Sequence, residues 1–414
     1  MGRFFSDVVD QVIEDIYYCY DNDRAKQAQA ALLKAASQGD GDACYLLSRC
    51  FSGTCFSWYY HPFEENEASA FAMLRRGISL GSALAVLGAL RMDMLTPELR
   101  EMMPFSSVKE AWEVIDEKAK EGCLLCQYLI GNTYYFLDVI EIEDKKEGEF
   151  ENSKAWDEWC KEQMEKCVPL FENAFAGGLS LAGRNLRDYY KQGRGNLIPP
   201  QPPKALEVIR RGAQLGYPDW MYHFGYFLFY KEKKKEEGLF WGLEAAKKGH
   251  VSGWGLVGDA YYFGEGVKQD FSYALECFEK AADDGNDDYA CGMVGDMYFL
   301  GQGTSKDYAR AVQYLERCYA MRDGKDMSID KLGLCCLLGY GCQQDVARGR
   351  QLLENGENTK YKNYGLGMMY AEGMGVPEDI KKGVEYLKAA GDYEPAKEAL
   401  KRYKKSLFGV WRRL

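Results

Sequence analysis

The chain has 414 residues, and its 52 Lys and Arg against 63 Asp and Glu give a formal net charge of −11 at pH 7. This acidic balance argues against a general nucleic-acid binder, which needs a basic face, so we expect no nucleic-acid partner. The chain begins without the apolar run of a secretory signal and holds no 18-residue apolar segment, so we expect a cytoplasmic protein.

Fourteen cysteines occur at irregular spacings, mostly inside apolar helical patterns such as GCLLCQYL around Cys123 and Cys126. Disulfide frameworks are typical of short secreted chains, so we expect these thiols to be reduced and buried. A zinc site would need a second pair of ligands near Cys123, whereas the histidines, His61, His223 and His250, stand apart from one another. We therefore expect no metal and no cofactor.

Residues 1–45 are predicted to form N-terminal capping helices, and residues 46–249 to form degenerate copies of a helical repeat. Each copy opens with apolar residues at helical spacing, as in LLSRCFSGTC from Leu46 and IGNTYYF from Ile130. A second helix then closes near glycine, with endings such as AASQG, EKAKEG and RRGAQLG.

Two segments interrupt these degenerate copies. The charged run from Asp138 to Lys154 is predicted to be an acidic insertion that forms a solvated loop or extended helix ends, with a docking site as the alternative. The proline-rich segment 196–204, NLIPPQPPK, is predicted to be a rigid loop. Its P-x-x-P-x-K pattern also matches ligands that bind SH3-type grooves as an extended helix.

Residues 250–391 contain four regular copies, which begin with VGDAYYFGEG, VGDMYFLGQG, LGLCCLLGYG and LGMMYAEGMG. The first glycine of each copy, such as Gly258, is predicted to mark a close crossing of two helices. The later pair, Gly264 and Gly266 in the first copy, ends the helix, and Asp270 caps the next one. The aspartates and paired glycines therefore predict structural turns and not a phosphate site.

In the second helix of each regular copy, a small residue follows the capping aspartate by four positions and an apolar residue follows by eight. Such a helical hairpin buries its apolar face only by stacking on its neighbours. The first helices of all copies can be aligned on the apolar residues at positions 47, 87, 130, 186, 224, 257, 294, 332 and 366. This alignment predicts nine units.

The pattern resembles the Sel-one-like repeat (SLR) family, a relative of the tetratricopeptide repeat, over most of the chain and most strongly over 250–391. The resemblance implies an all-α fold, a right-handed α/α superhelical solenoid of about nine helix-loop-helix repeats. It also implies an adaptor or scaffold for protein complexes, including complexes in signalling and protein quality control. The family supplies no catalytic residues, and we expect a monomer.

Residues 392–414 are predicted to form a basic C-terminal capping helix. Seven basic residues stand against one acid in AKEALKRYKKSLFGVWRRL, and Leu400, Tyr403, Leu407 and Trp411 recur at helical spacing. Such a helix would cover the open face of the last repeat. Contact with an anionic membrane is the alternative.

In tetratricopeptide-like stacks the first helix of each hairpin lines the concave side. Large rings on these helices are therefore our candidate partner-binding residues, because aromatic side chains make effective interface anchors. The candidates are Trp220, Trp254, Tyr262 and Phe299.

No nucleophile with a base and no converging carboxylates occur at informative spacing, so we expect no catalytic residues and no enzyme. The leading hypothesis is a non-enzymatic scaffold that binds a peptide or protein partner on its concave face. The alternatives are a hydrolase or hydrolase regulator built on the solenoid, and a membrane-associated adaptor that uses the basic tail.

Overall fold

The computed structural model describes residues 4–17, 21–53, 63–285, 287–322, 328–406 and 410–414. The chain divides into two compact units. The first comprises residues 1–224 with 247–250, and the second comprises residues 225–246 with 251–414.

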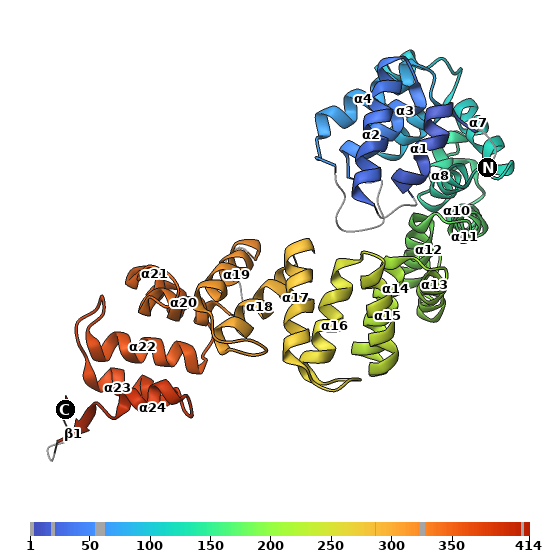
Figure 1. Cartoon of the computed structure of the whole chain (residues 1–414). Coiled ribbons are helices and arrows are strands. Elements are labelled where there is room, and N and C mark those ends of the chain that lie inside the picture. Colours follow the sequence, from blue (N-terminus) through green and yellow to red (C-terminus); the bar gives the residue numbers. More distant parts are fainter. Residues whose placement is uncertain (1–3, 18–20, 54–62, 286, 323–327, 407–409) are drawn as a thin grey trace. The chain divides into compact units, whose positions relative to one another are not determined.

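The first unit consists of helices, most of them paired as antiparallel hairpins (Figure 1). Two helices come first, α1 (Asp7–Tyr17) and α2 (Asn22–Ser37). The hairpins that follow are α3 (Gly41–Phe51) with α4 (Glu67–Ser79), α5 (Ala83–Arg91) with α7 (Val108–Lys120), α8 (Leu124–Tyr135) with α11 (Cys167–Ala176), and α12 (Ser180–Gln192) with α13 (Pro202–Gln214). Next along the chain is α14 (Pro218–Tyr226), which continues into a π-helical turn, Phe227–Lys231.

The second unit repeats the hairpin more regularly (Figure 1). It contains α15 (Lys235–Lys247) and then four hairpins: α16 (Val251–Phe263) with α17 (Phe271–Gly285), α18 (Asp288–Leu300) with α19 (Tyr308–Met321), α20 (Ile329–Leu338) with α21 (Val346–Asn355), and α22 (Lys360–Glu372) with α23 (Ile380–Ala389). Eight of the nine aligned positions fall on the first helix of one of these hairpins, and position 224 falls on α14, so the described residues confirm the predicted solenoid of helical hairpins.

The predicted helix crossings are confirmed by the space around the first glycine of each regular copy. A Cβ atom on Gly258 would lie 2.6 Å from Phe278 Cε1, and one on Gly295 would lie 2.7 Å from Leu315 Cδ2. Real Cβ atoms do not approach so closely, so only glycine permits this separation of the two helices. The same crowding surrounds Gly333 and Gly367.

The loops between paired helices also have the predicted chemistry. Gly301 has a φ of 72° and is the C-cap of α18, where its backbone N–H donates to the Met297 carbonyl. This left-handed conformation is free of steric cost in glycine. Asp307 then accepts a hydrogen bond from the Arg310 backbone N–H at 3.0 Å, as an N-cap does. Asp270, Asp345 and Asp379 cap their helices in the same way.

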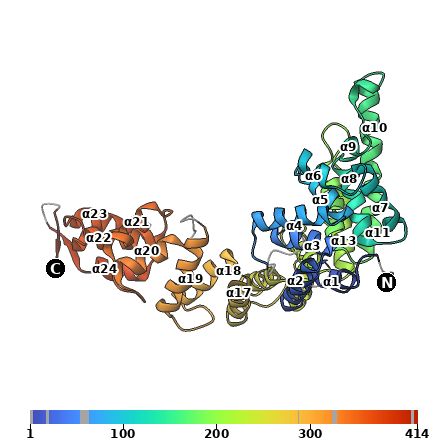
Figure 2. The same ribbon diagram turned by 90° about the horizontal axis from the view of Figure 1, so that it is seen from above.

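The charged insertion consists of short helical segments joined by mostly exposed residues, which is compatible with the predicted solvated loop or extended helix ends. It contains α9 (Val139–Ile142), a 3₁₀ turn (Glu147–Glu149) and the start of α10 (Ser153–Glu165), which reaches beyond the hairpins of the first unit (Figure 2). Asp138 explains the helical start, because it is partly buried in an ion pair with Arg91 at 2.6 Å.

In the proline-rich segment, Pro202 is already the first residue of α13. Proline fits this position because it needs no backbone donor there. An extended P-x-x-P ligand would need Pro202 outside a helix, so this structure supports the loop and not the docking motif.

The prediction of a C-terminal helix over 392–414 is wrong beyond residue 400. A short helix α24 (Glu394–Leu400) is followed by strand β1 (Tyr403–Lys405), which pairs antiparallel with β2 (Trp411–Arg413). Contacts with α22 favour this reversal of the chain. Tyr403 is buried and its hydroxyl donates to Glu372 at 2.6 Å. Arg413 donates to Glu372 and to the Ala371 carbonyl. A continuous helix would carry Arg413 away from these acceptors. The capping role of the tail stays a prediction.

All described cysteines have free thiols and all but Cys342 are buried, as predicted. Cys123 is the N-cap of α8, where its sulfur accepts a hydrogen bond from the Cys126 backbone N–H.

Candidate partner-binding site

Two successive first helices of the second unit carry the same five-residue pattern. It reads GLVGD from Gly255 to Asp259 in α16 and GMVGD from Gly292 to Asp296 in α18. The second glycine of each pattern packs against the partner helix of its own hairpin. The first glycine and the aspartate lie four residues apart, and therefore one above the other on a single helix face.

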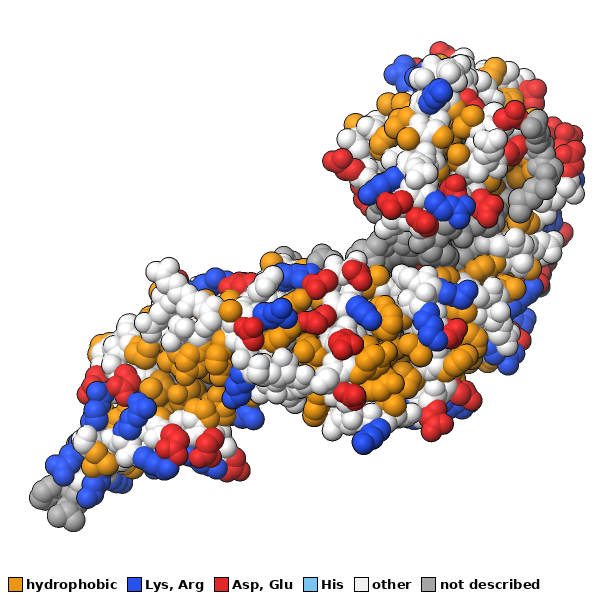
Figure 3. All heavy atoms as spheres, in the orientation of Figure 1, with side chains coloured by type: hydrophobic (Ala, Val, Ile, Leu, Met, Phe, Trp, Pro, Cys, Tyr) orange, Lys and Arg blue, Asp and Glu red, His pale blue; other side chains and the backbone are white. Residues whose placement is uncertain are grey.

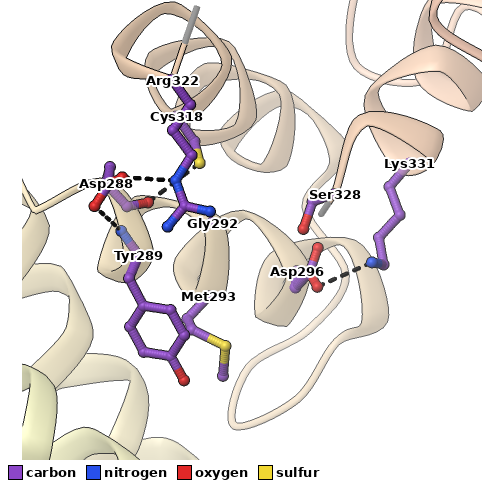
Figure 4. Close-up of a pocket in the computed structure, with 9 residues that line it drawn as sticks. All are labelled: Asp288, Tyr289, Gly292, Met293, Asp296, Cys318, Arg322, Ser328 and Lys331. Carbon is purple, nitrogen blue, oxygen red and sulfur yellow. Dashed lines mark hydrogen bonds and ion pairs between the residues drawn. The ribbon is translucent and has the colours of Figure 1, made fainter. Parts of the chain in front are cut away.

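A cavity of about 230 Å³ opens beside this face of α18 (Figure 4). It is lined by Asp288, Tyr289, Gly292, Met293 and Asp296 of α18, by Cys318 and Arg322 at the end of α19, and by Ser328 and Lys331 at the start of α20. The cavity thus lies between one repeat and the next within the second unit.

Both basic side chains of the cavity are engaged by carboxylates. Arg322 Nε donates to Asp288 Oδ2 at 2.6 Å, and Lys331 Nζ donates to Asp296 Oδ2 at 2.9 Å (Figure 4). A third carboxylate, Asp330, is almost fully buried with its Oδ1 3.9 Å from Lys331 Nζ. Among the residues that line the cavity, two carboxylates therefore match two cations, and Asp330 lies outside this lining.

Asp296 is the least satisfied of these carboxylates. Its Oδ1 is shielded from solvent and accepts no well-formed hydrogen bond from the described residues, although the Ser328 hydroxyl stands near enough to favour the charged form. Burial raises the pKa of Asp296, and Lys331 opposes that shift. Burial also disfavours charge on Lys331, but Asp296 and Asp330 outweigh it and hold the Lys331 pKa above its ordinary value.

Tyr289 connects the cavity to the preceding repeat. Its hydroxyl donates to Asp259 Oδ1 of α16 at 2.7 Å, and Asp259 also accepts a hydrogen bond from Tyr230. Burial raises the pKa of Asp259, and the two hydroxyl donors counteract this rise. The double anchor fixes the Tyr289 ring as a rigid wall of the cavity.

Gly255 lacks the crowding found at other helical glycines of α16. A Cβ atom there would meet, as its nearest described atom, Asp287 Oδ2 at 4.0 Å, whereas a Cβ on Gly253 would lie 2.7 Å from the Ala246 nitrogen. Glycine in a helix interior costs about 1 kcal/mol relative to alanine. No described packing contact accounts for that cost at Gly255, although the residue itself is buried.

Comparison with known families identifies the repeat. A model of the Sel1 repeat matches residues 213–250, 256–286, 288–321, 327–355 and 363–392. The chain contains five Sel1 repeats. The matched segments include most of α16 and all of α18 and α20, the helices that form the face described above.

Solved structures of other Sel1 repeat proteins are similar to this chain. One is a protective antigen of uropathogenic Escherichia coli strains with an SLR fold, at 19% identity and a TM-score of 0.49, covering 91% of this chain and 74% of the other. Another is a Sel1 repeat protein from Oxalobacter formigenes, at 20% identity and a TM-score of 0.47, covering 97% and 96%.

Two of the four predicted contact residues are core residues of this Sel1 repeat protein, so the prediction is wrong for them. Trp220 is 3% exposed and its indole Nε1 donates to Ser180 Oγ at 2.8 Å in the first unit. Phe299 is also 3% exposed and packs against Tyr308 and Tyr361. Helical aromatic spacing cannot distinguish a core ring from a surface ring, which explains both errors.

The other two predicted residues, Trp254 and Tyr262, lie half-buried on α16 in the second unit. Lys280 Nζ lies 4.3 Å from the centre of the Trp254 ring, and the Tyr262 hydroxyl donates to Gln302 Oε1 at 3.0 Å. Both remain candidate contact residues, although neither lines the cavity at α18.

The sequence analysis missed the cavity residues, although one signal was present. The repeated G-x-x-G-D places a carboxylate in two apolar helices that contain no Lys or Arg. The positions of Arg322 and Lys331 were not predictable, because they depend on where one repeat meets the next.

Hydrophobic and charged side chains alternate over the second unit, and Figure 3 shows hydrophobic patches with acidic and basic groups between them. Phe240 and Phe263 are more than half exposed. Within the described ranges, no group of three or more His, Cys, Asp or Glu is placed to hold a metal ion, and no helix there is long and apolar enough to cross a membrane.

A buried ionisable pair distinguishes α14 of the first unit. Asp219 Oδ1 lies 3.4 Å from His250 Nε2, and both side chains are 8% exposed. Burial raises the pKa of Asp219 to about 7 and lowers the pKa of His250 to about 3. Burial likewise lowers the pKa of nearby His223 to about 4.

Proposed function

We propose that this Sel1 repeat protein is a non-enzymatic scaffold or adaptor. It binds a peptide or protein partner on the face of the second unit formed by α16, α18 and α20, the predicted concave face. Sel1 repeat proteins are generally protein-interaction scaffolds. The observation that carries the proposal for this chain is the cavity at α18 beside the repeated G-x-x-G-D face.

Binding accounts for the chemistry of this face better than catalysis does. The Asp296 and Asp288 carboxylates are held by Lys331 and Arg322, and Asp259 is held by two tyrosine hydroxyls, so these groups are fixed in place. Small-molecule and cofactor pockets span about 300 to 1,000 Å³. A cavity of about 230 Å³ suits one inserted side chain better than a substrate or cofactor.

The proposal places the scaffold in the cytoplasm. The free and mostly buried thiols of the described cysteines support this assignment, because a reducing compartment keeps thiols unpaired.

A capture experiment tests the binding face. The purified full chain is immobilised, partners are captured from native lysate and identified by mass spectrometry, and the wild type is compared with Gly255→Leu. Gly255 is buried, and a Cβ there would meet Asp287 Oδ2 at 4.0 Å, so a leucine side chain would fill the space on this side of α16 and alter the face. Gly255→Ala is the matched control, because its Cβ fits without described contacts.

We expect a reproducible partner that Gly255→Ala retains and Gly255→Leu loses, with equal helical circular dichroism for all three proteins. Retention of every captured protein by a folded Gly255→Leu variant would contradict the proposed face.

A further inference from the structure

We propose that the β-hairpin formed by β1 and β2 is a second docking surface, which binds an extended acidic segment of a protein partner. The segment adds to the open edge of β2 as a third strand. This inference goes beyond the proposed function, because the β-hairpin lies outside the face formed by α16, α18 and α20.

Positive charge is concentrated on the β-hairpin. Residues 401–414 contain six Lys and Arg and no Asp or Glu, in a chain whose formal net charge is −11. Two of the six are ion-paired, Lys401 with Glu398 and Arg413 with Glu372. The other four are exposed and form no ion pair with the described residues: Arg402, Lys404, Lys405 and Arg412. An acidic segment would meet a basic surface that the protein itself does not neutralise.

Two of these cations lie directly opposite each other. The register of the β-hairpin pairs Lys404 with Arg412. Tyr403 and Arg413 are also opposite each other, and both side chains donate to Glu372 of α22. Because side chains alternate along a strand, Lys404 and Arg412 lie on the other, outer face. Like charges directly opposite in a sheet are destabilising, so a carboxylate beside Arg412 would offset this repulsion.

The backbone of β2 has an open edge. The N–H of residue 406 donates to the carbonyl of residue 410, and that of 414 donates to the carbonyl of 402. Hydrogen-bonded pairs alternate along an antiparallel ladder, so the N–H and C=O groups of Trp411 and Arg413 point away from β1. No hydrogen bond among the described residues uses these groups. They favour a protein segment over a lipid surface, because an extended backbone can pair with them.

A groove of about 740 Å³ lies beside β2. It is lined by Val410 and Trp411 of the β-hairpin, by Tyr370 of α22 and by residues 377–382 at the start of α23. Side chains of an added strand would alternate between this groove, with its apolar groups, and the outer face that carries Arg412. The partner segment should therefore alternate apolar and acidic residues.

The charged groups of the groove itself do not oppose an acidic segment. Asp379 caps α23 by accepting a hydrogen bond from the Lys382 backbone N–H at 2.9 Å, and Glu378 Oε2 lies 3.7 Å from Arg413 Nη2. Both carboxylates are thus engaged. Lys381 and Lys382 also line the groove, and neither side chain forms an ion pair with the described residues.

Peptide binding to the full chain tests the inference. A fluorescent heptapeptide in which glutamate and valine alternate is titrated with the protein and followed by anisotropy. One control peptide alternates lysine and valine, and another contains the same residues as the first with glutamates and valines in separate blocks. We expect the alternating acidic peptide to bind at least about tenfold more tightly than either control.

A charge reversal locates the site on the β-hairpin. Arg412→Glu should weaken binding of the alternating acidic peptide about tenfold. Lys268→Glu is the matched control, because it makes the same change of charge at an exposed position outside the β-hairpin, and it should leave the affinity unchanged. Circular dichroism checks that both variants fold.

N-methylation of the peptide tests backbone pairing without changing the protein. Only one set of alternate amides in an added strand faces β2. Of two peptides methylated on complementary sets of amides, we expect one to lose binding and the other to keep it. Binding by both would mean that charge alone attracts the peptide, and would overturn the inference.

Two further results would overturn the inference: equal affinity for the acidic and basic peptides, and unchanged binding by a folded Arg412→Glu variant. Sedimentation with phosphatidylserine vesicles covers the lipid alternative. Binding to the vesicles without binding to the acidic peptide would assign the β-hairpin to a membrane. Gly255→Leu lies on α16 and should not change peptide affinity, so this proposal and the proposed function can fail separately.

Discussion

The two units of the molecule build the same helical hairpin, but the loops between the helices are regular in length in the second unit and irregular in the first. In the second unit the aligned apolar positions of the first helices are 257, 294, 332 and 366, so successive repeats are 37, 38 and 34 residues apart. In the first unit the aligned positions 47, 87, 130 and 186 are 40, 43 and 56 residues apart. Added segments such as α6 (Pro97–Met102) and α10 lie between the paired helices. Chain length therefore varies in the loops and not in the helix interface.

The two helices of a hairpin pack against each other in the same way in both units. A Cβ on Gly131 of α8 would lie 2.6 Å from Phe171 Cε1 of α11, as a Cβ on Gly258 would from Phe278. In each case a large side chain of the second helix occupies the space left by glycine on the first. The comparison shows that a repeat can lose its regular loop sequence and keep its packing.

The loops differ in how they connect neighbouring repeats. In the second unit the first glycine of each G-x-G ends the helix, and the second one touches the preceding repeat. A Cβ on Gly266 would lie 2.7 Å from the Lys235 carbonyl carbon, and one on Gly341 would overlap the Tyr308 backbone. In the described part of the first unit, the G-x-G at 193–195 does not repeat this contact, because a Cβ on Gly195 would have no heavy atom within 4 Å.

The largest predicted effect comes from Gly341→Ala. The new Cβ would overlap backbone atoms of Tyr308, and a left-handed φ of 71° adds conformational strain. We expect a loss of at least about 3 kcal/mol in the free energy of unfolding, measured by urea denaturation. Gly339→Ala is the control. It has the same φ, but its Cβ meets only Gln344 Cβ at 3.3 Å, so the loss should be about 1 to 2 kcal/mol. Equal losses would contradict the inter-repeat role of the second glycine.

Two matched substitutions test whether the units share one packing rule. Gly295→Leu in the second unit would overlap Leu315, and Gly131→Leu in the first would overlap Phe171. Overpacking costs about 1 to 3 kcal/mol, and we expect losses in this range for both variants. Thermal unfolding followed by circular dichroism measures the effect. A destabilised Gly295→Leu with an unaffected Gly131→Leu would mean that the first unit packs by a different rule.

The buried carboxylates of the two units should respond differently to pH. Asp259 accepts hydrogen bonds from two tyrosine hydroxyls, whereas Asp219 lies 3.4 Å from His250 and burial raises its pKa to about 7. Between its unfolded pKa near 4 and its folded pKa near 7, Asp219 binds its proton more tightly in the folded state. Its contribution to stability therefore falls as pH rises through this window.

Asp219→Asn should remove this fall. We expect the variant to gain about 2 kcal/mol of unfolding free energy relative to the wild type on going from pH 5 to pH 8, measured by urea denaturation at each pH. The opposing contributions of His223 and His250, whose lowered pKa values favour stability at higher pH, are present in both proteins and cancel in the comparison. A pH dependence that matches the wild type would contradict the assignment.

The smallest predicted effect concerns the helix caps. Asp307 accepts from the Arg310 backbone N–H at 3.0 Å in the second unit, and Asn152 accepts from the Ala155 backbone N–H at 3.0 Å in the first. Replacing either by alanine should cost about 1 kcal/mol. Equal losses of stability in the two units would show that each cap stabilises only its own helix, whether or not the repeat is regular. A loss several times larger for Asp307→Ala would indicate that its loop does more than cap α19.

The sequence predicted the features that depend on local chemistry. Helix crossings, left-handed glycines and capping aspartates recur at fixed spacing, so Gly258, Gly301 and Asp307 were assignable without coordinates. The errors depend on tertiary contacts. The basic tail has helical spacing, but Tyr403 and Arg413 find partners on α22 by turning back as a hairpin.

The candidate site was harder to predict for the same reason. Trp220 and Phe299 have the ring chemistry of interface anchors, yet neighbouring helices cover them. The cavity at α18 is assembled from the end of one hairpin and the start of the next, and its cations come from segments outside the recurring motif. Only the repeated G-x-x-G-D could have drawn attention to Asp296.

The most direct test of the account is hydrogen exchange of the full chain, followed by mass spectrometry, with and without a saturating amount of the partner identified in the capture experiment. We predict slower exchange in α16, α18 and α20 of the second unit, with the hairpins of the first unit unchanged. Protection confined to the first unit, or to the second helices α17, α19 and α21, would contradict the claim that the G-x-x-G-D face is the binding surface.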